Sequence, residues 1–260
     1  MNFGLSGAAQ SFQRFIDMVL RDITVTDQLG KTRKVAVFAY IDDLLLASKN
    51  EQQHKIDLEA VLHRLNEYNL KLNVHKCQFF VDSLEFLGHK VSSKGLEPLP
   101  SKVSAISEFP LPKNYKQLRR FLGMINFYHR FLKHAAEILA PLNALLTGYS
   151  KANSKKLICW EQHPKARKAF DCARNALANA TMLHYPSIDG ELAVFTDASD
   201  IAVGGVLNQW RENEWVPLGF FSRKLQKRET LLSAFARELL AVYLSLKYFY
   251  HWLEGNTFTV

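Results

Sequence analysis

Apolar residues along this chain fall into short runs that alternate with stretches of helical spacing. Two of the runs, residues 34–39 and 44–47, flank the adjacent carboxylates Asp42 and Asp43. Each run is short and β-compatible, so we expect two strands that meet at an acidic tip. An Asp-rich turn is the plain alternative, although turns favour Gly, Asn or Pro and none occurs here. Because a carboxylate beside buried strands is costly unless it is paired or binds a metal, the pattern favours a cation site.

The remainder of the first 95 residues predicts further alternation of helices and strands in an α/β layer. An apolar stripe predicts a helix that ends near residue 20, with Ser6 as its N-cap. The spacing of Ser48 and Glu51 is that of a capping box, which predicts a second helix. Residues 77–81 and 84–91 are predicted to be strands. The expected buried stripes of the two helices are Phe12, Phe15, Ile16, Val19 and Leu20, and Leu58, Val61, Leu62, Leu65 and Tyr68.

Prolines between residues 98 and 112 mark a boundary near residue 96 and bracket a short helix at residues 103–109. The pattern then predicts a long helix at residues 116–134, in which Gly123 marks either a tight packing contact or a break. Residues 148–168 are polar and indicate a linker or an exposed loop.

The last third of the chain has a different pattern. A helix at residues 164–180 is followed by predicted strands at 192–197, 202–209 and 215–222, and by a long helix at 230–253. A further strand is predicted at 258–260. We expect the core stripe of the long helix to consist of Phe235, Leu239, Tyr243 and Leu246.

Composition narrows the function classes. The chain has 260 residues, a formal net charge of +8 and a pI near 9.3, which indicates a polyanionic partner such as nucleic acid. Residues 109–136 carry six Lys or Arg and no acid, which favours a phosphate-backbone contact over an ordinary solvated helix face. Three cysteines without metal spacing predict reduced intracellular thiols, and neither a signal peptide nor a membrane-length apolar run is evident. We therefore expect an intracellular protein with no membrane partner.

The order of motifs is recognisable. Tyr40-Ile41-Asp42-Asp43 resembles the metal-binding box of reverse transcriptases, and the whole chain resembles the polymerase polyprotein of gypsy-type long-terminal-repeat retrotransposons. Five further blocks follow the family's order. Phe3-Gly4-Leu5 with Phe12-Gln13-Arg14 resembles the palm segment beside the incoming nucleotide. Lys71-Leu72-Asn73 with Lys76-Cys77 resembles the next palm motif, and Phe86-Leu87-Gly88-His89 resembles the primer grip. Residues 117–123 with 126–131 resemble the thumb helix. Residues 196–199 and 237–241 resemble the first two acidic motifs of RNase H.

The resemblance implies an α+β / α/β fold and a domain order. A partial polymerase palm (an antiparallel sheet with helices) would cover residues 1–95, a helical thumb 96–148, a connecting segment 149–190, and the N-terminal part of an RNase H-like mixed α/β domain 191–260. It also implies RNA-directed DNA polymerase and ribonuclease H activities, acting on a primer–template, an RNA–DNA hybrid and deoxynucleoside triphosphates, in contact with the rest of the polyprotein.

The site residues follow from the same resemblance. Two Mg²⁺ ions per complete site would be held by Asp42 and Asp43, and by Asp197 and Glu238, with Asp42 the more direct ligand of its pair. The residues implied in binding substrate and nucleic acid are Phe3, Gly4, Gln13, Tyr40, Lys76, Phe86, Leu87, Gly88, Arg119, Arg120, Arg130 and Lys133. Tyr40 could gate ribose selection or fill the hairpin core. His89, His129 and His134 match no zinc spacing.

The sequence also departs from the family. The polymerase site needs a further aspartate and the fingers from a region upstream of Phe3, and the RNase H site needs two more aspartates downstream of Glu238. We therefore expect the isolated 260-residue chain to extend no primer and to cleave no hybrid. A non-catalytic nucleic-acid-binding remnant is the alternative function.

Overall fold

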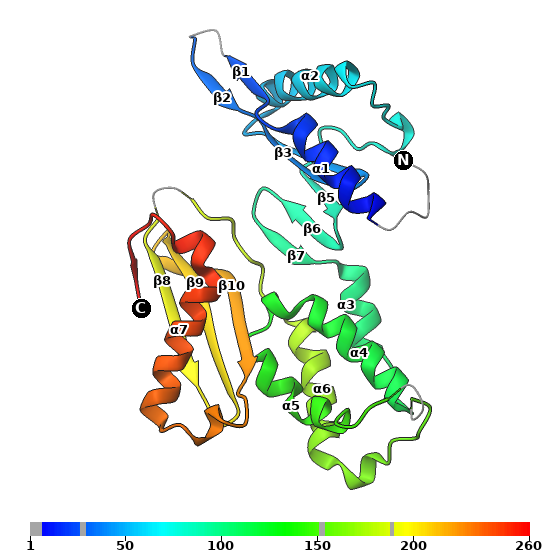
Figure 1. The fold of residues 1–260 in the computed structure, drawn as a ribbon, viewed down its shortest axis with the longest axis vertical. Helices are drawn as coiled ribbons and strands as arrows, with labels where there is room; N and C mark the ends of the chain where they lie inside the picture. The colour runs from blue at the N-terminus through cyan, green and yellow to red at the C-terminus, as the bar shows by residue number, and fades with distance from the viewer. Residues whose placement is uncertain (1–6, 27–29, 151–153, 188–189) are drawn as a thin grey trace. The chain divides into compact units, whose positions relative to one another are not determined.

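The computed structural model describes residues 7–26, 30–150, 154–187 and 190–260, and it divides after Phe86 into two units (Figure 1). Unit 1 contains two helices, a short 3-10 helix and antiparallel strand pairs, as the α+β prediction requires. Its elements are α1 (Ala8–Leu20), β1 (Thr24–Thr26), β2 (Thr32–Lys34), β3 (Ala36–Tyr40), β4 (Asp43–Ala47), α2 (Glu51–Glu67), η1 (Val74–Lys76) and β5 (Ser83–Phe86).

The predicted acidic hairpin is confirmed. Strands β3 and β4 pair antiparallel, with Ala39 opposite Leu44 and Tyr40 opposite Asp43. Side chains alternate between the two faces of a strand. The inward face carries Val37, Ala39, Leu44 and Leu46, which pack against buried residues of the two helices. The core of unit 1 therefore fixes the base of the hairpin and leaves its tip outside.

Both helices of unit 1 form where the pattern predicts, but their caps and faces differ in detail. Helix α1 buries Ile16, Val19 and Leu20 as expected, whereas the predicted cap Ser6 lies outside the described residues. Helix α2 is capped by Asn50, whose side chain accepts a hydrogen bond from the backbone N of Gln53 at 2.9 Å. The predicted cap, Ser48, instead donates its hydroxyl hydrogen bond to the Asp57 carboxylate. Two residues of the stripe predicted for α2, Leu62 and Tyr68, are exposed.

A buried ion pair joins the strands of unit 1 to α2. Asp57 is fully buried on α2, and its two carboxylate oxygens accept hydrogen bonds from the guanidinium of Arg33 at 2.5 Å and from the hydroxyl of Ser48 at 2.6 Å. A buried carboxylate is tolerated only when its charge is paired in this way. The network therefore links β2, the end of β4 and α2.

Two strand predictions in unit 1 and at its boundary are wrong. Residues 77–81 form no strand, and Phe80 among them has φ 55°, a left-handed backbone that an extended strand does not adopt. The predicted strand at 84–91 is interrupted at Leu87-Gly88, so that β5 ends at Phe86 and a new strand begins at His89. Leu87 and Gly88 have φ values of 48° and 78°, which are the conformations of a tight two-residue turn.

Unit 2 contains a group of packed helices and a four-stranded sheet. Its elements are β6 (His89–Ser92), β7 (Leu96–Pro98), α3 (Pro100–Ser107), α4 (Tyr115–Phe127), η2 (His129–Phe131), α5 (Ala135–Leu145), η3 (Trp160–Gln162), α6 (Pro164–Ala178), β8 (Leu192–Ala198), β9 (Ala202–Arg211), β10 (Glu214–Lys224), η4 (Glu229–Leu231), α7 (Ala234–Leu253) and β11 (Phe258–Thr259). Among the described residues, no helix is long and apolar enough to cross a bilayer.

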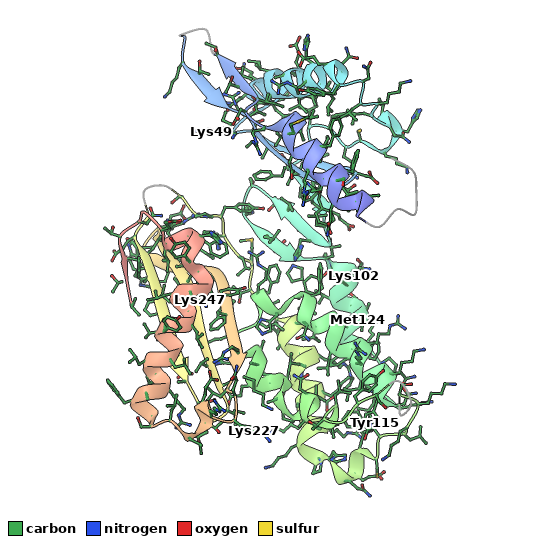
Figure 2. The ribbon with its side chains drawn as sticks, viewed as in Figure 1. Lys49, Lys102, Tyr115, Met124, Lys227 and Lys247 are labelled. Carbon is green, nitrogen blue, oxygen red and sulfur yellow. The ribbon has the colours of Figure 1, made fainter. Side chains whose placement is uncertain are left out.

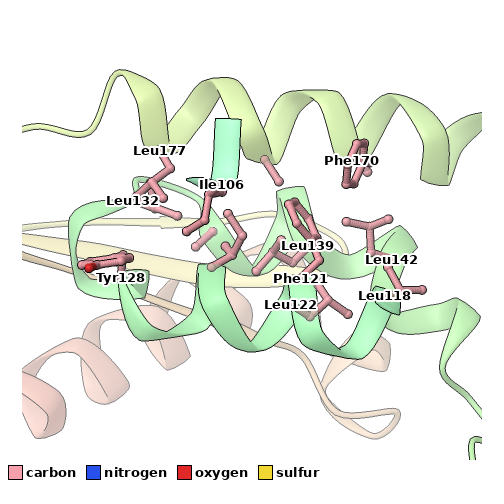
Figure 3. Close-up of a cluster of buried hydrophobic side chains, with 14 of the residues drawn as sticks. Ile106, Leu118, Phe121, Leu122, Tyr128, Leu132, Leu139, Leu142, Phe170 and Leu177 are labelled. Atoms are coloured by element: carbon pink, nitrogen blue, oxygen red, sulfur yellow. The ribbon is translucent and has the colours of Figure 1, made fainter. Parts of the chain in front are cut away.

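The largest core of the chain joins α3, α4, α5 and α6 (Figure 3). The rings of Phe121 on α4 and Phe170 on α6 lie 4.6 Å apart at its centre. The predicted linker at 148–168 contributes to this core, because Ile158 and Trp160 are buried and the indole N–H of Trp160 donates to the backbone oxygen of Pro112 at 2.7 Å. The prediction of a linker or exposed loop is therefore wrong for the part of this stretch around Ile158 and Trp160, which is packed.

The sheet of unit 2 has the strand order β10-β9-β8-β11. Strands β8, β9 and β10 are antiparallel neighbours, and β11 runs parallel to β8. Helix α7 packs against β8 and β9, while α5 packs against β10. On β10, Phe220 belongs to the core of helices α3 to α6, whereas Phe221 packs toward α7. The sheet and helices α3 to α6 therefore share one core.

The core stripe predicted for α7 is wrong for three of its four residues, whereas the fourth, Leu246, is half-buried against the core. Phe235, Leu239 and Tyr243 are 79%, 60% and 60% exposed, and the buried residues are Ala241, Ser245, Phe249 and Leu253. The helix is apolar on several faces, so periodicity alone does not identify the packed face. Small residues determine which face of the helix is packed. Ser245 lies so close to Gly205 of β9 that a Cβ added to this glycine would lie 2.3 Å from the Ser245 hydroxyl. Lys247, labelled in Figure 2, is also on the exposed part of this helix.

We predict that Arg33→Met lowers the free energy of unfolding of unit 1 by about 3 kcal/mol, because it leaves the buried charge of Asp57 unpaired. Urea unfolding measured by circular dichroism and by hydrogen exchange tests this. The matched control is Lys34→Met, which breaks the exposed Lys34–Asp22 pair and should cost much less. Equal losses in the two variants would contradict the role given to the buried pair.

We also predict opposite effects for two glycine substitutions in unit 2. Gly88→Ala should lower the unfolding free energy by about 1–2 kcal/mol, because an L-residue is disfavoured at φ 78° and the new Cβ would lie 2.9 Å from the Phe127 ring. Gly123→Ala should raise it by about 1 kcal/mol, because Gly123 is inside α4 and nothing lies within 4 Å of an added Cβ. Thermal unfolding of the two variants measures both signs, and a stabilised Gly88→Ala chain would refute the turn geometry.

Candidate active site and nucleic-acid interface

The hairpin tip presents two carboxylates to solvent. Ile41 and Asp42 form the two-residue loop between β3 and β4, and Asp43 is the first residue of β4. Both carboxylates are exposed. By strand register, Asp43 shares the outward face with Tyr40 and Phe38, which are 54% and 57% exposed. Tyr40 therefore does not fill the hairpin core, which was one of its two predicted roles.

The loop has an unusual backbone that one side chain of α1 contacts. Ile41 has φ 51°, a conformation that β-branched residues rarely adopt. The side-chain amide of Gln13 accepts a hydrogen bond from the backbone N of Ile41 at 2.7 Å and donates one to the backbone oxygen of Ala39 at 3.1 Å. The sequence predicts Gln13 as a substrate contact, and the structure places it against the hairpin backbone.

The donor set at the tip suits a hard cation. Adjacent carboxylates are the ligands that Mg²⁺ prefers, and Mg²⁺ commonly keeps water and substrate phosphates as its remaining ligands. Within the described ranges, no group of three or more His, Cys, Asp or Glu could enclose a metal by itself. Asp42 and Asp43 can therefore supply part of a coordination shell.

Three other predicted contacts of unit 1 have less structural support. Lys76 is exposed in the 3-10 helix η1. Phe3 and Gly4 lie outside the described residues. Their predicted roles therefore still rest on the sequence resemblance.

Gly88 and His89 of the predicted primer-grip block are held against the C-terminal end of α4, within unit 2. The hydroxyl of Tyr128 donates to the backbone oxygen of Gly88 at 2.8 Å. The ring of His89 stacks on Phe127 with centroids 5.1 Å apart. Burial lowers the pKa of His89 and outweighs the hydrogen bond to the Leu87 backbone oxygen, which raises it, and the nearby charge of Arg130 adds to the lowering. His89 is therefore a neutral packing residue at neutral pH, and Leu87 remains exposed at the turn.

Helix α4 exposes a basic face that is free of acids. Lys116, Arg120, Gly123 and Phe127 recur at helical spacing along α4 and are all exposed. The spacing of four, three and four residues places them on one side of the helix, opposite the buried Leu118, Phe121, Leu122 and Ile125. The structure thus separates the charged face from the core.

The other predicted basic contacts differ in how they are held. The guanidinium of Arg119 lies 5.2 Å from the centroid of the Tyr149 ring, and that of Arg130 lies 6.0 Å from the Phe131 ring. Lys133 is exposed just before α5. The aromatic contacts restrain two arginines that could meet a phosphate backbone, and Tyr149 was not identified from the sequence.

The predicted RNase H acids lie on different elements. Asp197 is on β8 opposite Gly204, and it lines a small pocket together with His134 and Glu137, which lie at the start of α5. The Nδ1 atom of His134 lies 3.9 Å from the Asp197 carboxylate. Glu238 is exposed on α7 and does not line this pocket. The sequence did not identify Glu137, because it lies in no recognised motif and only the folded structure brings it into the pocket of Asp197.

Comparison with known proteins gives matches at both ends of the chain. Residues 1–91 match the family described as reverse transcriptase (RNA-dependent DNA polymerase), and residues 162–260 match the RNase H-like domain found in reverse transcriptase. The Transposon Tf2-3 and Tf2-7 polyproteins of Schizosaccharomyces pombe are each 32% identical to this chain over 257 residues. The alignment covers 98% of this chain and 18% of each relative, so the chain spans less than a fifth of their length.

Solved structures share the fold. The foamy viral protease-reverse transcriptase in complex with dsDNA matches 99% of this chain and 50% of its own, with a TM-score of 0.79 and 19% identity. The same viral protein in complex with an RNA/DNA hybrid matches 99% of this chain and 33% of its own, with a TM-score of 0.77 and 19% identity. The chain therefore combines a region that matches the reverse transcriptase family, at residues 1–91, with a region that matches the RNase H-like domain found in reverse transcriptases, at residues 162–260.

Proposed function

We propose that this chain contributes the palm hairpin and the duplex-gripping thumb of a retrotransposon RNA-directed DNA polymerase of the gypsy type. The observation that carries the proposal is the exposed Asp42-Asp43 pair at the tip of an otherwise apolar hairpin. Nucleotidyl transfer needs carboxylates at a rigid position where a primer end can reach them. The β3–β4 hairpin offers this arrangement.

Asp42 and Asp43 would hold Mg²⁺ in the polymerase. Two bound Mg²⁺ ions would supply activation of the primer hydroxyl and stabilisation of the leaving pyrophosphate. Asp42, in the loop, acts as the more direct ligand, and Asp43 adds negative charge beside it. Tyr40 shares a face with Asp43 and offers a ring on which a primer or nucleotide sugar can rest. Lys76 supplies a positive charge for the triphosphate.

The thumb would hold the primer–template through its backbone. Arg119, Arg120, Arg130 and Lys133 contact phosphates, which gives affinity without sequence preference. The turn at Phe86, Leu87 and Gly88 would support the primer strand, and its attachment to Tyr128 and Phe127 couples that support to the thumb. Phe3 and Gly4 would border the incoming nucleotide.

The remaining assignments belong to the same proposal. Residues 1–95 serve as palm, 96–148 as thumb, 149–190 as connecting segment and 191–260 as the start of the RNase H-like domain. Asp197 and Glu238 would hold Mg²⁺ for endonucleolytic cleavage of the RNA strand of an RNA–DNA hybrid. Deoxynucleoside triphosphates and the rest of the polyprotein are the other partners, in an intracellular particle or the nucleus.

A second function, duplex binding without catalysis, is favoured by one observation. Six basic residues and no acid between residues 109 and 136 would grip a duplex whether or not a cation binds at the hairpin. Duplex binding by a chain with no cation site at Asp42 would support this second function.

The thumb assignment predicts a specific salt dependence. The wild-type chain should bind an RNA–DNA duplex with an affinity that falls steeply as salt rises, and Arg120→Ala should reduce the slope of log K against log salt by about 1. Fluorescence anisotropy from low to physiological salt measures the slope. Arg167→Ala, an exposed arginine on α6, is the matched control and should leave the slope unchanged. Salt-independent binding by the wild type would contradict the proposal.

The metal assignment predicts that Mn²⁺, a paramagnetic substitute for Mg²⁺, broadens the amide signals of residues 40–44 in nuclear magnetic resonance spectra of this chain. Asp42→Asn removes one anionic ligand, so the Mn²⁺ concentration needed for half-maximal broadening should rise about tenfold, the equivalent of 1.4 kcal/mol. Asp82→Asn, an exposed acid of the same unit, is the matched control. Broadening that spares residues 40–44, or is unchanged by Asp42→Asn, would overturn the assignment.

A further inference from the structure

We infer that Gln13 is a positioning residue that sets the shape of the Asp42-Asp43 tip from behind and does not contact substrate. The inference rests on the proposed function of the tip as a cation site. It assigns Gln13 a role different from the substrate contact that the sequence resemblance implies.

Both ends of the Gln13 amide are engaged by the hairpin. Its oxygen accepts from the backbone N of Ile41 at 2.7 Å, and its nitrogen donates to the backbone oxygen of Ala39 at 3.1 Å. The two backbone groups flank Tyr40, at the end of β3. One side chain therefore bridges the end of strand β3 and the first residue of the loop.

Asp17 fixes the orientation of this amide. The Gln13 nitrogen also donates to the Asp17 carboxylate at 2.8 Å, one helical turn along α1. A carboxylate and a backbone carbonyl can only accept, whereas a backbone N–H can only donate. The amide therefore fits in one orientation only, with its oxygen toward Ile41.

The bridge holds a conformation that the loop would not keep by itself. Ile41 is the first central residue of the loop and has φ 51°, where a two-residue hairpin turn normally has Gly. A β-branched residue in this region costs roughly 1–3 kcal/mol. A hydrogen bond to its backbone N contributes about 1 kcal/mol, and the second bond to Ala39 restrains the same turn.

The direction of the neighbouring carboxylates depends on this turn. Asp42 follows Ile41 directly, so a change in the φ of Ile41 redirects the Asp42 side chain. Without Gln13, the loop would relax toward conformations in which the Asp42 carboxylate has a different direction. The apparent cation affinity then falls in proportion to the fraction of chains that keep the competent loop.

The test compares Gln13→Leu with Gln10→Leu in the whole 260-residue chain. Gln10 is an exposed glutamine on the same helix, so the second variant makes the same chemical change without touching the hairpin. We expect Gln13→Leu to raise the Mn²⁺ concentration for half-maximal broadening of residues 40–44 about tenfold. It should also speed hydrogen exchange at the Ile41 amide, and circular dichroism should show that the fold is intact.

A rescue variant separates positioning from ordinary loss of packing. Glycine adopts φ 51° without strain, so the double change Gln13→Leu with Ile41→Gly should recover most of the lost Mn²⁺ affinity. Unchanged Mn²⁺ affinity in Gln13→Leu, or a loss that Ile41→Gly does not relieve, would overturn the positioning role while leaving the cation site intact. Absence of Mn²⁺ broadening in the wild type would instead refute the proposed function and this inference with it.

Discussion

Two hydrogen bonds from Gln13 to the turn of the β3–β4 hairpin are the constraint on which the candidate polymerase site depends. They hold Ile41 at a positive φ, and this backbone sets where Asp42 and Asp43 stand. The bonds form only because α1 lies against β3, and α1 lies there because Ile16, Val19 and Leu20 are buried in the core of unit 1. Burial of the hydrophobic stripe of α1 therefore places Gln13 where it can hold the acidic tip in its conformation.

Unit 2 shows a second separation of roles. Helix α4 buries Leu118, Phe121, Leu122 and Ile125 and keeps an acid-free basic face in solvent. The core beneath it extends through α5 and α6 to Phe220 of the sheet, and Ser222 of β10 accepts a hydrogen bond from the backbone N of Ala136 at the start of α5 at 3.0 Å. Helices α3 to α6 and the sheet of unit 2 are therefore built as one packed body, in which the same core supports the exposed basic face of α4 and the sheet that carries Asp197.

The sequence predicted the elements that have a strong one-sided pattern. The acidic hairpin, α1, the strands β8 to β10 and the basic character of α4 were all visible in it. It predicted the helix α7 but not the buried face of that helix, because Ala241 and Ser245 pack against a glycine-lined strand and leave the larger Phe235 and Leu239 outside. It also missed the interruption at Leu87-Gly88 and the contact of Gln13, since a side-chain hydrogen bond across 28 residues leaves no periodic signal. Such contacts depend on tertiary packing.

The central claim, that Asp42 and Asp43 form a cation site, is tested most directly by iron-mediated cleavage. Fe²⁺ replaces Mg²⁺ at hard oxygen ligands and, with ascorbate and peroxide, cuts the polypeptide next to where it is bound. The account predicts backbone cleavage concentrated at residues 40–44, suppressed by excess Mg²⁺ and abolished by Asp42→Asn. Cleavage spread along the chain, or concentrated elsewhere and unaffected by Asp42→Asn, would contradict it.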